Sequence, residues 1–564
     1  MEKSSREIKV FRQLKAEYAR ISATGASSDE ILSHMKQVHE TVTAAYEAPA
    51  READGSIKKV PTVRFGRTEL QMPILTLGCM RFQQTWQEWN TMSLGDVEAA
   101  CQANLDAILS RAFELGVRHV ETARMYGSSE LQLGRALKKF PRDAYILQTK
   151  IIPMDDMAAF RATLDASLND KLQVERVDLL SLHGVNTHRQ LEMATRPGGC
   201  LDVLEEYRRA GRIGHIGFST HGMTDVILDA INTGRFDYVN LHYHFLGSYT
   251  ASGGPHGGGN RAAVAAAQAH DMGVFIISPA DKGGKLYKPS LKFSAACLPD
   301  ATPLAFGNLW LWAQDPPCHT AVVGVARPED LDEHYAAAML YDRRKEISDR
   351  VAARLQKMAV EALGKEWLDT WWQGLPGPYE ENTKGIAVGQ MVWYWNLLQA
   401  YGMYDFCRDR FATHENVAAS WDPAKTFQAN CDALYSLHFM PGNAWTGDLP
   451  QAALADALRG SPHADKVLEI LCQVRDWLCK ESIESQKEWR AARGWAAAYD
   501  LQADLPFPER VPMPEQVARK AREDKRAAEA EAAAAGGSAV PLLVGGAALG
   551  AAAVGVALMR AHRR

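Results

Sequence analysis

The chain has 564 residues, more than twice the length of about 250 residues that a single (β/α)8 barrel takes. Hydrophobic residues make up 46% and charged residues 23%, which is ordinary for globular proteins and excludes a disordered chain. The net charge of −5 gives no basic footprint for nucleic acid. Nine cysteines are scattered without a CxxC spacing, so we expect reduced thiols in a reducing compartment.

Residues 1–60 form the first predicted unit, an N-terminal helical extension. Apolar side chains recur at helical spacing, as at Val10, Leu14 and Tyr18, which predicts a charged amphipathic helix followed by a polar linker. The first residues mix acids with bases and contain no apolar run, which argues against a secretory signal. We assign no chemistry to this unit.

The next segment predicts a hairpin, a first strand that ends near Met80, and then three strands that are each followed by a polar residue. The stretch after the first of these three contains Tyr126, at a turn where a phenol can serve as a proton donor beside a pocket. The second strand closes on Lys150 and the third on His183. Polar residues at the C-terminal ends of successive strands are how a (β/α)8 barrel builds an active site. We therefore expect Tyr126, Lys150 and His183 to converge at one mouth.

This order and spacing resemble the aldo/keto reductases, whose catalytic tetrad is Asp, Tyr, Lys and His. The resemblance implies an α/β fold with a (β/α)8 TIM barrel over residues 61–345. It also implies that Tyr126 is the acid, that Lys150 favours the tyrosinate, and that His183 orients a carbonyl group. Glu121 stands where the family has Asp, so one extra methylene is expected to change the geometry with Lys150.

The resemblance further implies a nicotinamide dinucleotide, NADP with NAD as the alternative. In the family a Ser and an Asn after the fifth barrel strand hold the carboxamide; here Ser219 is kept and Thr220 replaces Asn. Arg327 is the candidate for the 2′-phosphate, because a guanidinium fork suits phosphate. Glycines after the seventh strand suit the pyrophosphate, because they let backbone N–H groups approach. The implied cofactor-binding residues are Met80, Ser219, Thr220, Asn240, Ser278, Gly283, Gly284, Gly324, Arg327 and Glu333.

Two further features of the barrel sequence bear on its chemistry. Ile277 stands where many family members place an aromatic ring under the nicotinamide, so we expect no such stacking contact. His242 and His244 lie two residues apart on one strand face, which suggests a metal site, but no third ligand falls at ligand spacing. The other interpretation is that these histidines line the substrate pocket or form hydrogen bonds in the core. We predict no bound metal.

Beyond residue 345 the sequence is rich in Trp and predicts an all-helical domain over residues 346–510. It resembles the C-terminal extension of an aldo/keto reductase branch with ferredoxin-type iron–sulfur clusters, and looks closest to cyanobacterial and plastid-lineage members. A cluster needs about four cysteine thiolates. Only Cys431 lies near an expected ligand position, so we predict no cluster. Trp residues such as Trp367 and Trp372 are then expected to fill the space by packing.

The C-terminal end predicts a membrane anchor. Residues 511–537 form a charged, Ala-rich spacer before a predicted transmembrane tail at 538–560. The run 539–559 carries no charge and is long enough for a bilayer core of about 30 Å at about 1.5 Å per residue. This predicts a single-pass anchor in a mitochondrial or plastid membrane. Gly546 and Gly550 form a GxxxG face that suits a second membrane helix.

Two functions remain open from these residues. The first is an NAD(P)H-dependent oxidoreductase that transfers hydride between the cofactor and an aldehyde, ketone or alcohol, attached to a membrane by its tail. The alternative is an NADP(H)-binding scaffold or redox sensor with little turnover. The intact Tyr126, Lys150 and His183 favour the enzyme. The scaffold is favoured by Glu121, Thr220 and Ile277. No nucleic-acid partner is expected.

Overall fold

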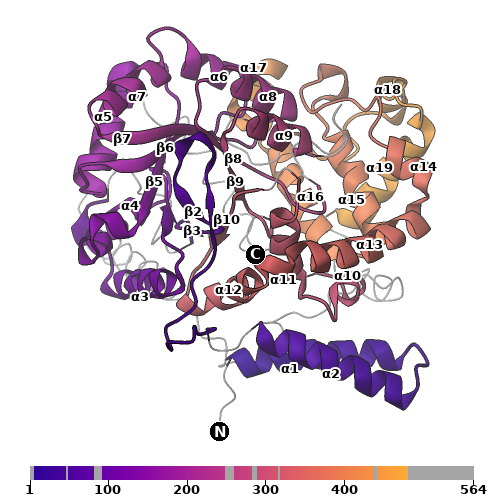
Figure 1. Ribbon diagram of the computed structural model, residues 1–564. Coiled ribbons are helices and arrows are strands. Elements are labelled where there is room, and N and C mark those ends of the chain that lie inside the picture. The colour runs from indigo at the N-terminus through magenta and orange to yellow at the C-terminus, as the bar shows by residue number, and fades with distance from the viewer. Residues whose placement is uncertain are drawn as a thin grey trace, which may run out of the picture.

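The protein is described by a computed structural model over residues 5–45, 49–81, 92–247, 259–281, 289–315, 318–435 and 441–479. Eight parallel strands close into a barrel in the order β10-β3-β4-β5-β6-β7-β8-β9 (Figure 1). Each strand therefore pairs with its neighbours in the sequence, and the last pairs with the first. The strands are β3 (Leu75–Gly78), β4 (His119–Glu121), β5 (Ile146–Ile151), β6 (Val177–His183), β7 (Ile213–Ser219), β8 (Tyr238–Leu241), β9 (Gly273–Ile277) and β10 (Thr320–Gly324). The predicted (β/α)8 barrel is confirmed.

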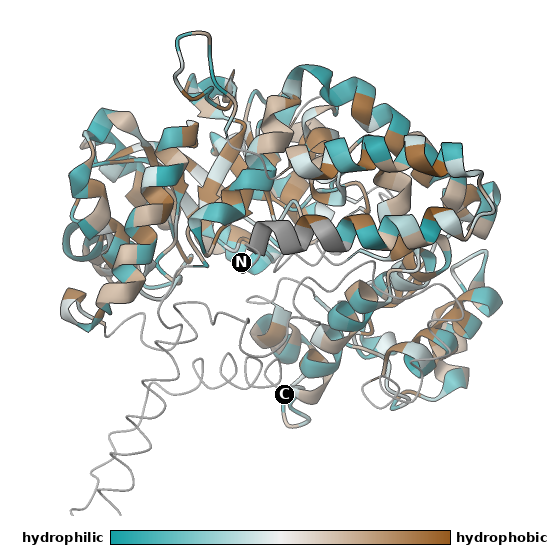
Figure 2. Ribbon diagram, turned by 90° about the horizontal axis from the view of Figure 1, so that it is seen from below, coloured by the Kyte–Doolittle hydropathy of each residue, from teal (hydrophilic) through white to brown (hydrophobic). Residues whose placement is uncertain are grey.

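Helices connect the strands and cover the outside of the barrel, as parallel strands require. Hydrophilic and hydrophobic residues are mixed along the helices in Figure 2, as expected of helices with one buried face. The helices between and after the barrel strands are α3 (Ala99–Leu115), α4 (Ser129–Ala136), α5 (Met157–Asp165), α6 (His188–Thr195), α7 (Cys200–Arg209), α8 (Thr224–Asn232), α9 (Arg261–Ala269), α10 (Leu291–Cys297), α11 (Pro303–Trp312) and α12 (Asp332–Met339).

A hairpin of β1 (Thr62–Arg64) and β2 (Gln71–Pro73) closes the N-terminal end of the barrel, as the resemblance implied. Its Phe65 is fully buried, with its ring centroid 4.4 Å from that of Phe275 on β9. A Cβ atom on Gly273 would lie 2.3 Å from the Phe65 ring, so this strand starts with glycine where the hairpin presses against it. The plug leaves the opposite, C-terminal end of the barrel for chemistry.

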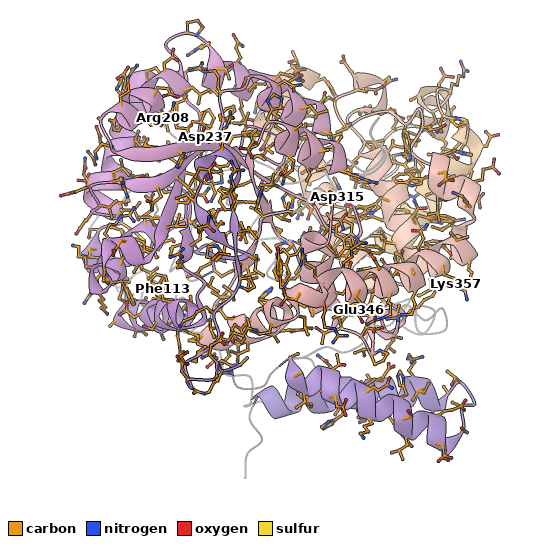
Figure 3. All side chains as sticks on the ribbon, in the orientation of Figure 1. Phe113, Arg208, Asp237, Asp315, Glu346 and Lys357 are labelled. Atoms are coloured by element: carbon orange, nitrogen blue, oxygen red, sulfur yellow. The ribbon has the colours of Figure 1, made fainter. Side chains whose placement is uncertain are left out.

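Asp237 ties the same end of the barrel to its outer helices. Its Oδ2 atom accepts a hydrogen bond of 2.9 Å from the backbone N–H of Ile216 on β7, and Arg208 on α7 lies 3.4 Å from that oxygen. Figure 3 shows Arg208 and Asp237 side by side. The carboxylate thus joins α7, β7 and the start of β8.

The N-terminal extension consists of two helices, α1 (Ser5–Ser22) and α2 (Ser28–Ala44), rather than the one helix that the spacing predicted. The chain turns at Gly25, whose φ of +76° suits glycine. Ser27 and Glu30 then form a capping box that starts α2. The two helices pack against each other, and α2 contacts the barrel through a small apolar cluster with Leu298.

The part after the barrel is helical, as predicted. It contains α13 (Arg344–Leu363), α14 (Lys365–Thr370), α15 (Val388–Tyr401), α16 (Tyr404–Ala419), α17 (Phe427–Tyr435), α18 (Gln451–Ala457) and α19 (Ala464–Leu478), which we call the helical extension. Helix α15 is buried on nearly all sides between α13, α16 and α19. Trp367 is buried and packs edge-on against Trp395, with 6.0 Å between the ring centroids. The domain boundaries at residues 60, 345 and 510 stay predictions.

The predicted membrane localisation is corrected. Within the described residues, no helix has both the length and the apolar composition that a membrane crossing requires. The predicted tail at 538–560 and the spacer at 511–537 lie outside the described residues. A mitochondrial or plastid anchor and a membrane-helix partner are therefore not assigned.

The buried position of Phe65 generates a stability prediction. We expect Phe65→Ala to lower the free energy of unfolding by about 3–5 kcal/mol, because the cavity lies between the hairpin and three strands. Urea denaturation measures this change, and Tyr18→Ala, at a side chain that is 56% exposed, serves as the control with almost no loss. A Phe65→Ala protein as stable as the control would show that the hairpin does not help to close the barrel.

Candidate active site

The structure brings the four residues of the predicted tetrad together at the C-terminal ends of three adjacent strands. Glu121 ends β4, Lys150 lies near the end of β5, and His183 ends β6. Tyr126 lies in the turn between β4 and α4 and reaches back over Lys150. The strand ends meet because the barrel is closed and parallel, so residues that are 62 positions apart in the sequence share one mouth.

Lys150 is the electrostatic centre of this mouth. Its ammonium group forms a buried ion pair with Glu121, and both side chains are at most 3% exposed. The same nitrogen donates hydrogen bonds of 2.9 Å to the carbonyl oxygen of Thr122 and 3.2 Å to the hydroxyl oxygen of Tyr126. Burial lowers the pKa of Lys150, and the carboxylate of Glu121 opposes that change. The longer side chain of Glu121 therefore still reaches the lysine.

Tyr126 is held as a neutral phenol. Burial raises the pKa of its hydroxyl well above the usual value, and the negative charge of Glu121 acts in the same direction. The Lys150 ammonium lies 4.6 Å from the ring centroid, and the ring of His183 meets the tyrosine ring edge-on at 5.7 Å. Lys150 is the donor in its hydrogen bond with Tyr126, so the phenol oxygen accepts in that bond. The hydroxyl can therefore donate its own hydrogen to another group.

A layer of polar side chains lies inside the barrel beside the tetrad. Gln148 on β5 donates to Ser181 at 2.9 Å and to Oδ1 of Asn240 at 3.2 Å. Asn240, which was predicted to reach a carboxamide, is completely buried. Among the described residues, its Nδ2 atom has no hydrogen-bond partner. Since a buried amide donor is normally satisfied, this atom is a candidate contact for a bound group.

Ser219 ends β7 beside His183, and Thr220 follows it; the two hydroxyls make different hydrogen bonds. The hydroxyl of Ser219 accepts a hydrogen bond of 3.1 Å from the backbone of Gly184, which leaves its own hydrogen for donation. Thr220 donates to the carbonyl of Val185 at 2.7 Å and accepts from the backbone of Gly222 at 2.9 Å. Thr220 therefore holds the turn after β7, while Ser219 keeps a donor.

The remaining predicted cofactor residues lie around β9, β10 and the following helix. Met80 is half-buried after β3, Gly324 is exposed at the end of β10, and Ser278 follows β9 with a left-handed φ of 54°. Gly283 and Gly284 lie outside the described residues. Arg327 pairs with Asp330 at 2.9 Å.

Glu333, predicted to lie on the adenine side, is engaged by the barrel's own chain. Its Oε1 atom accepts a hydrogen bond of 2.6 Å from the hydroxyl of Thr302, which caps α11. His334 beside it is buried, and burial lowers the pKa of this histidine to about 4. Glu333 therefore has a hydrogen-bond partner within the protein, at the position where the resemblance implies a contact with the cofactor.

The two histidines of the sixth barrel strand do not act together. His242 forms a hydrogen bond with His221 at 2.6 Å, and His244 stacks on Trp393 of the helical extension, with 6.4 Å between the ring centroids. In the described part of the chain, no group of three His, Cys, Asp or Glu residues is arranged to hold a metal ion. The interpretation as core or pocket residues fits these contacts.

Three participants in this site were missed in the sequence. The carbonyl of Thr122 and the side chain of Gln148 had no signal, because a backbone acceptor and an interior amide look like ordinary strand residues. Asp281, after β9, forms an ion pair with Arg410, which lies 129 positions later. A contact over that distance leaves no local pattern.

The closed barrel and the polar cluster at its mouth define a TIM barrel with a candidate active site at the C-terminal ends of its strands. The family model described as Aldo/keto reductase family matches residues 75–283, from β3 to just beyond β9. This match supports the aldo/keto reductase superfamily for the barrel. It covers less than half of the chain and does not extend to the helical extension.

The chain is also similar to individual proteins. The D-threo-aldose 1-dehydrogenase of a Pseudomonas species is 25% identical over 281 residues, which cover 41% of this chain and 82% of that protein. The NADH-specific methylglyoxal reductase of Escherichia coli is 26% identical over 212 residues, 34% of this chain and 60% of that protein. A solved aldo-keto reductase from Klebsiella pneumoniae in complex with NADPH is 19% identical and covers 52% of this chain and 95% of that one, with a TM-score of 0.40.

The buried ion pair at the mouth generates the next prediction. We expect Lys150→Met to lower the free energy of unfolding by about 3–5 kcal/mol, because Glu121 is left as an unpaired buried charge. The double variant Lys150→Met/Glu121→Gln should recover most of this loss, since it removes both charges. Urea denaturation of the single and double variants measures the difference. A double variant no more stable than Lys150→Met would contradict the ion pair.

Proposed function

We propose that the protein is an NADP-dependent carbonyl reductase or alcohol dehydrogenase that uses Tyr126, Lys150, His183 and Glu121 as its catalytic tetrad. The observation that carries this proposal is the position of the Lys150 ammonium between the Glu121 carboxylate and the Tyr126 hydroxyl. General acid catalysis needs a proton donor at a defined place, and this contact fixes the phenol oxygen.

The proposed proton chemistry follows from the charges. Tyr126 is protonated at neutral pH, as an ordinary phenol is, but burial raises its pKa and makes it a weaker acid, so proton donation depends on the Lys150 ammonium beside the phenol oxygen. Lys150 stabilises the negative charge that develops on the phenol oxygen as the proton leaves. His183, whose ring lies against Tyr126, orients the carbonyl oxygen of the substrate. Glu121 keeps Lys150 in position.

The proposed cofactor is NADP, with NAD as the alternative, and when bound it supplies the hydride. The residues at the mouth fit a nicotinamide carboxamide: Ser219 retains a hydroxyl hydrogen, and the buried Nδ2 atom of Asn240 has no partner among the described residues. Arg327 would hold a 2′-phosphate in competition with Asp330. Met80, Thr220, Ser278, Gly283, Gly284, Gly324 and Glu333 complete the proposed set.

We propose a small aldehyde, ketone or alcohol as the substrate. The two relatives are named for the oxidation of an aldose and the reduction of methylglyoxal, both small carbonyl chemistry. The tetrad at the barrel mouth would act on the carbonyl group itself, so it suits small aldehydes, ketones and alcohols in general. For the helical extension we propose descent from the iron–sulfur branch with loss of the cluster ligands.

The alternative function, a dinucleotide-binding scaffold or sensor with little turnover, is favoured by one observation. Thr220 is occupied by backbone hydrogen bonds, so the carboxamide would have one contact fewer than in the family. Weaker positioning of the nicotinamide lowers turnover more than it lowers binding, because reaction geometry tolerates little displacement.

The first functional prediction separates these alternatives. Tyr126→Phe removes the proton donor alone, so we expect the dissociation constant for NADPH to stay within about twofold while carbonyl reduction falls by about 10²–10⁴-fold. Steady-state kinetics with a panel of aldehydes, together with isothermal titration of NADPH, measures both. Tyr207→Phe is the matched control, since that hydroxyl binds Asp165 on the outer helices.

Glu121→Asp is the companion variant, because it restores the family's residue and should keep or raise the activity. If wild-type protein binds NADPH but reduces no carbonyl in the panel, the enzyme hypothesis is wrong and the scaffold hypothesis is supported.

The second functional prediction concerns the choice of cofactor. Arg327→Ala removes the guanidinium and should raise the dissociation constant for NADPH about tenfold, because one charge-assisted hydrogen bond is lost. The dissociation constant for NADH should stay unchanged. Titration of both cofactors measures the ratio. Arg343→Ala, which breaks a surface pair of the same spacing with Glu346, is the control. An unchanged NADPH-to-NADH ratio in Arg327→Ala would remove Arg327 from the site.

A further inference from the structure

The helical extension contacts the barrel mouth through one buried ion pair. Arg410 on α16 places its Nε and one terminal nitrogen 2.7 Å and 2.6 Å from Oδ2 of Asp281, which follows β9. The side chains are 3% and 0% exposed. A buried carboxylate and guanidinium are costly to desolvate and strongly destabilising when only one is removed, so this pair holds two distant segments in one geometry.

Asp281 closes a turn with unusual backbone geometry. The residues Ser278 and Asp281 have φ values of 54° and 61°, although neither is glycine. The backbone N–H of Asp281 donates a hydrogen bond of 2.9 Å to the carbonyl of Ser278. Left-handed backbone at such residues costs about 1–3 kcal/mol each and persists only where the surroundings impose it. Arg410 is the buried partner that imposes it at Asp281.

Two further contacts fix the same side of the mouth. The indole N–H of Trp393 on α15 donates a hydrogen bond of 2.8 Å to the carbonyl of Leu246, after β8. The hydroxyl of Ser290, at the start of α10, donates to the carbonyl of Tyr401. The helical extension therefore contacts the connection after β8 and both flanks of the segment between Asp281 and Ser290.

His244, which follows β8, is a titratable side chain that interacts electrostatically with both members of the pair. Burial lowers the pKa of this histidine to about 4, so it is neutral at physiological pH and does not compete with Arg410 for Asp281. In the described part of the chain, Oδ1 of Asp281 is buried without a hydrogen-bond partner. The carboxylate thus uses one oxygen for Arg410 and keeps the other as an acceptor on the barrel side.

We infer that Arg410 is a positioning residue for the dinucleotide: it holds the Ser278–Asp281 turn in the shape that binds the cofactor. This inference rests on the proposed function and deepens it, because it makes the helical extension part of the cofactor site. The barrel without Arg410 keeps its tetrad but loses the constraint on the strained turn. Cofactor affinity then falls, while the chemistry at Tyr126 is unchanged once the cofactor is bound.

The test compares Arg410→Gln and Arg410→Lys with wild type in the full-length protein. Arg410→Gln should raise the dissociation constant and the KM for NADPH about tenfold. A change of this size lies within the usual range of coupling between two sites in a protein. At saturating NADPH, kcat and the KM for the aldehyde should stay within about twofold. Arg410→Lys keeps the charge but not the planar fork, so an intermediate loss is expected. A purely structural role would lower only the temperature of unfolding.

Arg354→Gln is the matched control. Arg354 on α13 forms an ion pair of 2.7 Å with Asp300, a partly exposed contact between the helical extension and the segment after α10. It should keep wild-type affinity for NADPH. If wild type itself binds no NADPH, the proposed function fails and this inference fails with it.

If wild type binds NADPH and reduces carbonyls, but folded Arg410→Gln and Arg410→Lys bind NADPH as tightly, the inference alone is overturned. Equal weakening by Arg354→Gln overturns it as well. Should Arg410→Gln not fold, the same criteria are applied to Arg410→Lys.

Discussion

The mouth of the barrel is organised around one buried positive charge. Lys150 is 1% exposed, and an ammonium group so placed must be paired and fully hydrogen-bonded. Glu121 supplies the opposite charge from β4, and the turn that follows β4 supplies a carbonyl and the Tyr126 hydroxyl. The same charge acts on its neighbours: burial and the nearby lysine lower the pKa of His119 to about 3. The position of Tyr126 in the turn after β4 and the ion pair with Glu121 both depend on this charge.

Most of the barrel could be predicted from the sequence because the patterns that specify its strands lie within short segments of the chain. Apolar runs that end in a polar residue mark strands whose carboxyl ends meet, and this alone brought Tyr126, Lys150 and His183 to one mouth. The hairpin plug followed from the family resemblance, and Phe65 against Gly273 shows its physical basis. Helix boundaries were less accurate: one helix was expected in the N-terminal extension, but the chain turns at Gly25 and forms α1 and α2.

What could not be predicted depends on contacts between distant segments or on surroundings. The pair between Asp281 and Arg410 has no sequence pattern, since each residue alone looks like a solvated charge. The role of Thr220 in holding the turn after β7 depends on the carbonyl of Val185, which only the folded chain places nearby. The predicted membrane tail at 538–560 lies outside the described residues, and the predicted localisation was wrong because no helix of the described part of the chain can cross a membrane.

The exchange of Asp for Glu at position 121 bears on whether the mouth can turn over. An ammonium group has three hydrogens to donate. Lys150 uses them on the Glu121 carboxylate, the Thr122 carbonyl and the Tyr126 hydroxyl, so no direction is left for it to move. A longer carboxylate would impair the site only if it drew the lysine away from Tyr126. The hydrogen bond of 3.2 Å from Lys150 to the phenol oxygen shows that it does not, so the substitution at 121 is compatible with turnover, and the geometry favours the enzyme over the scaffold.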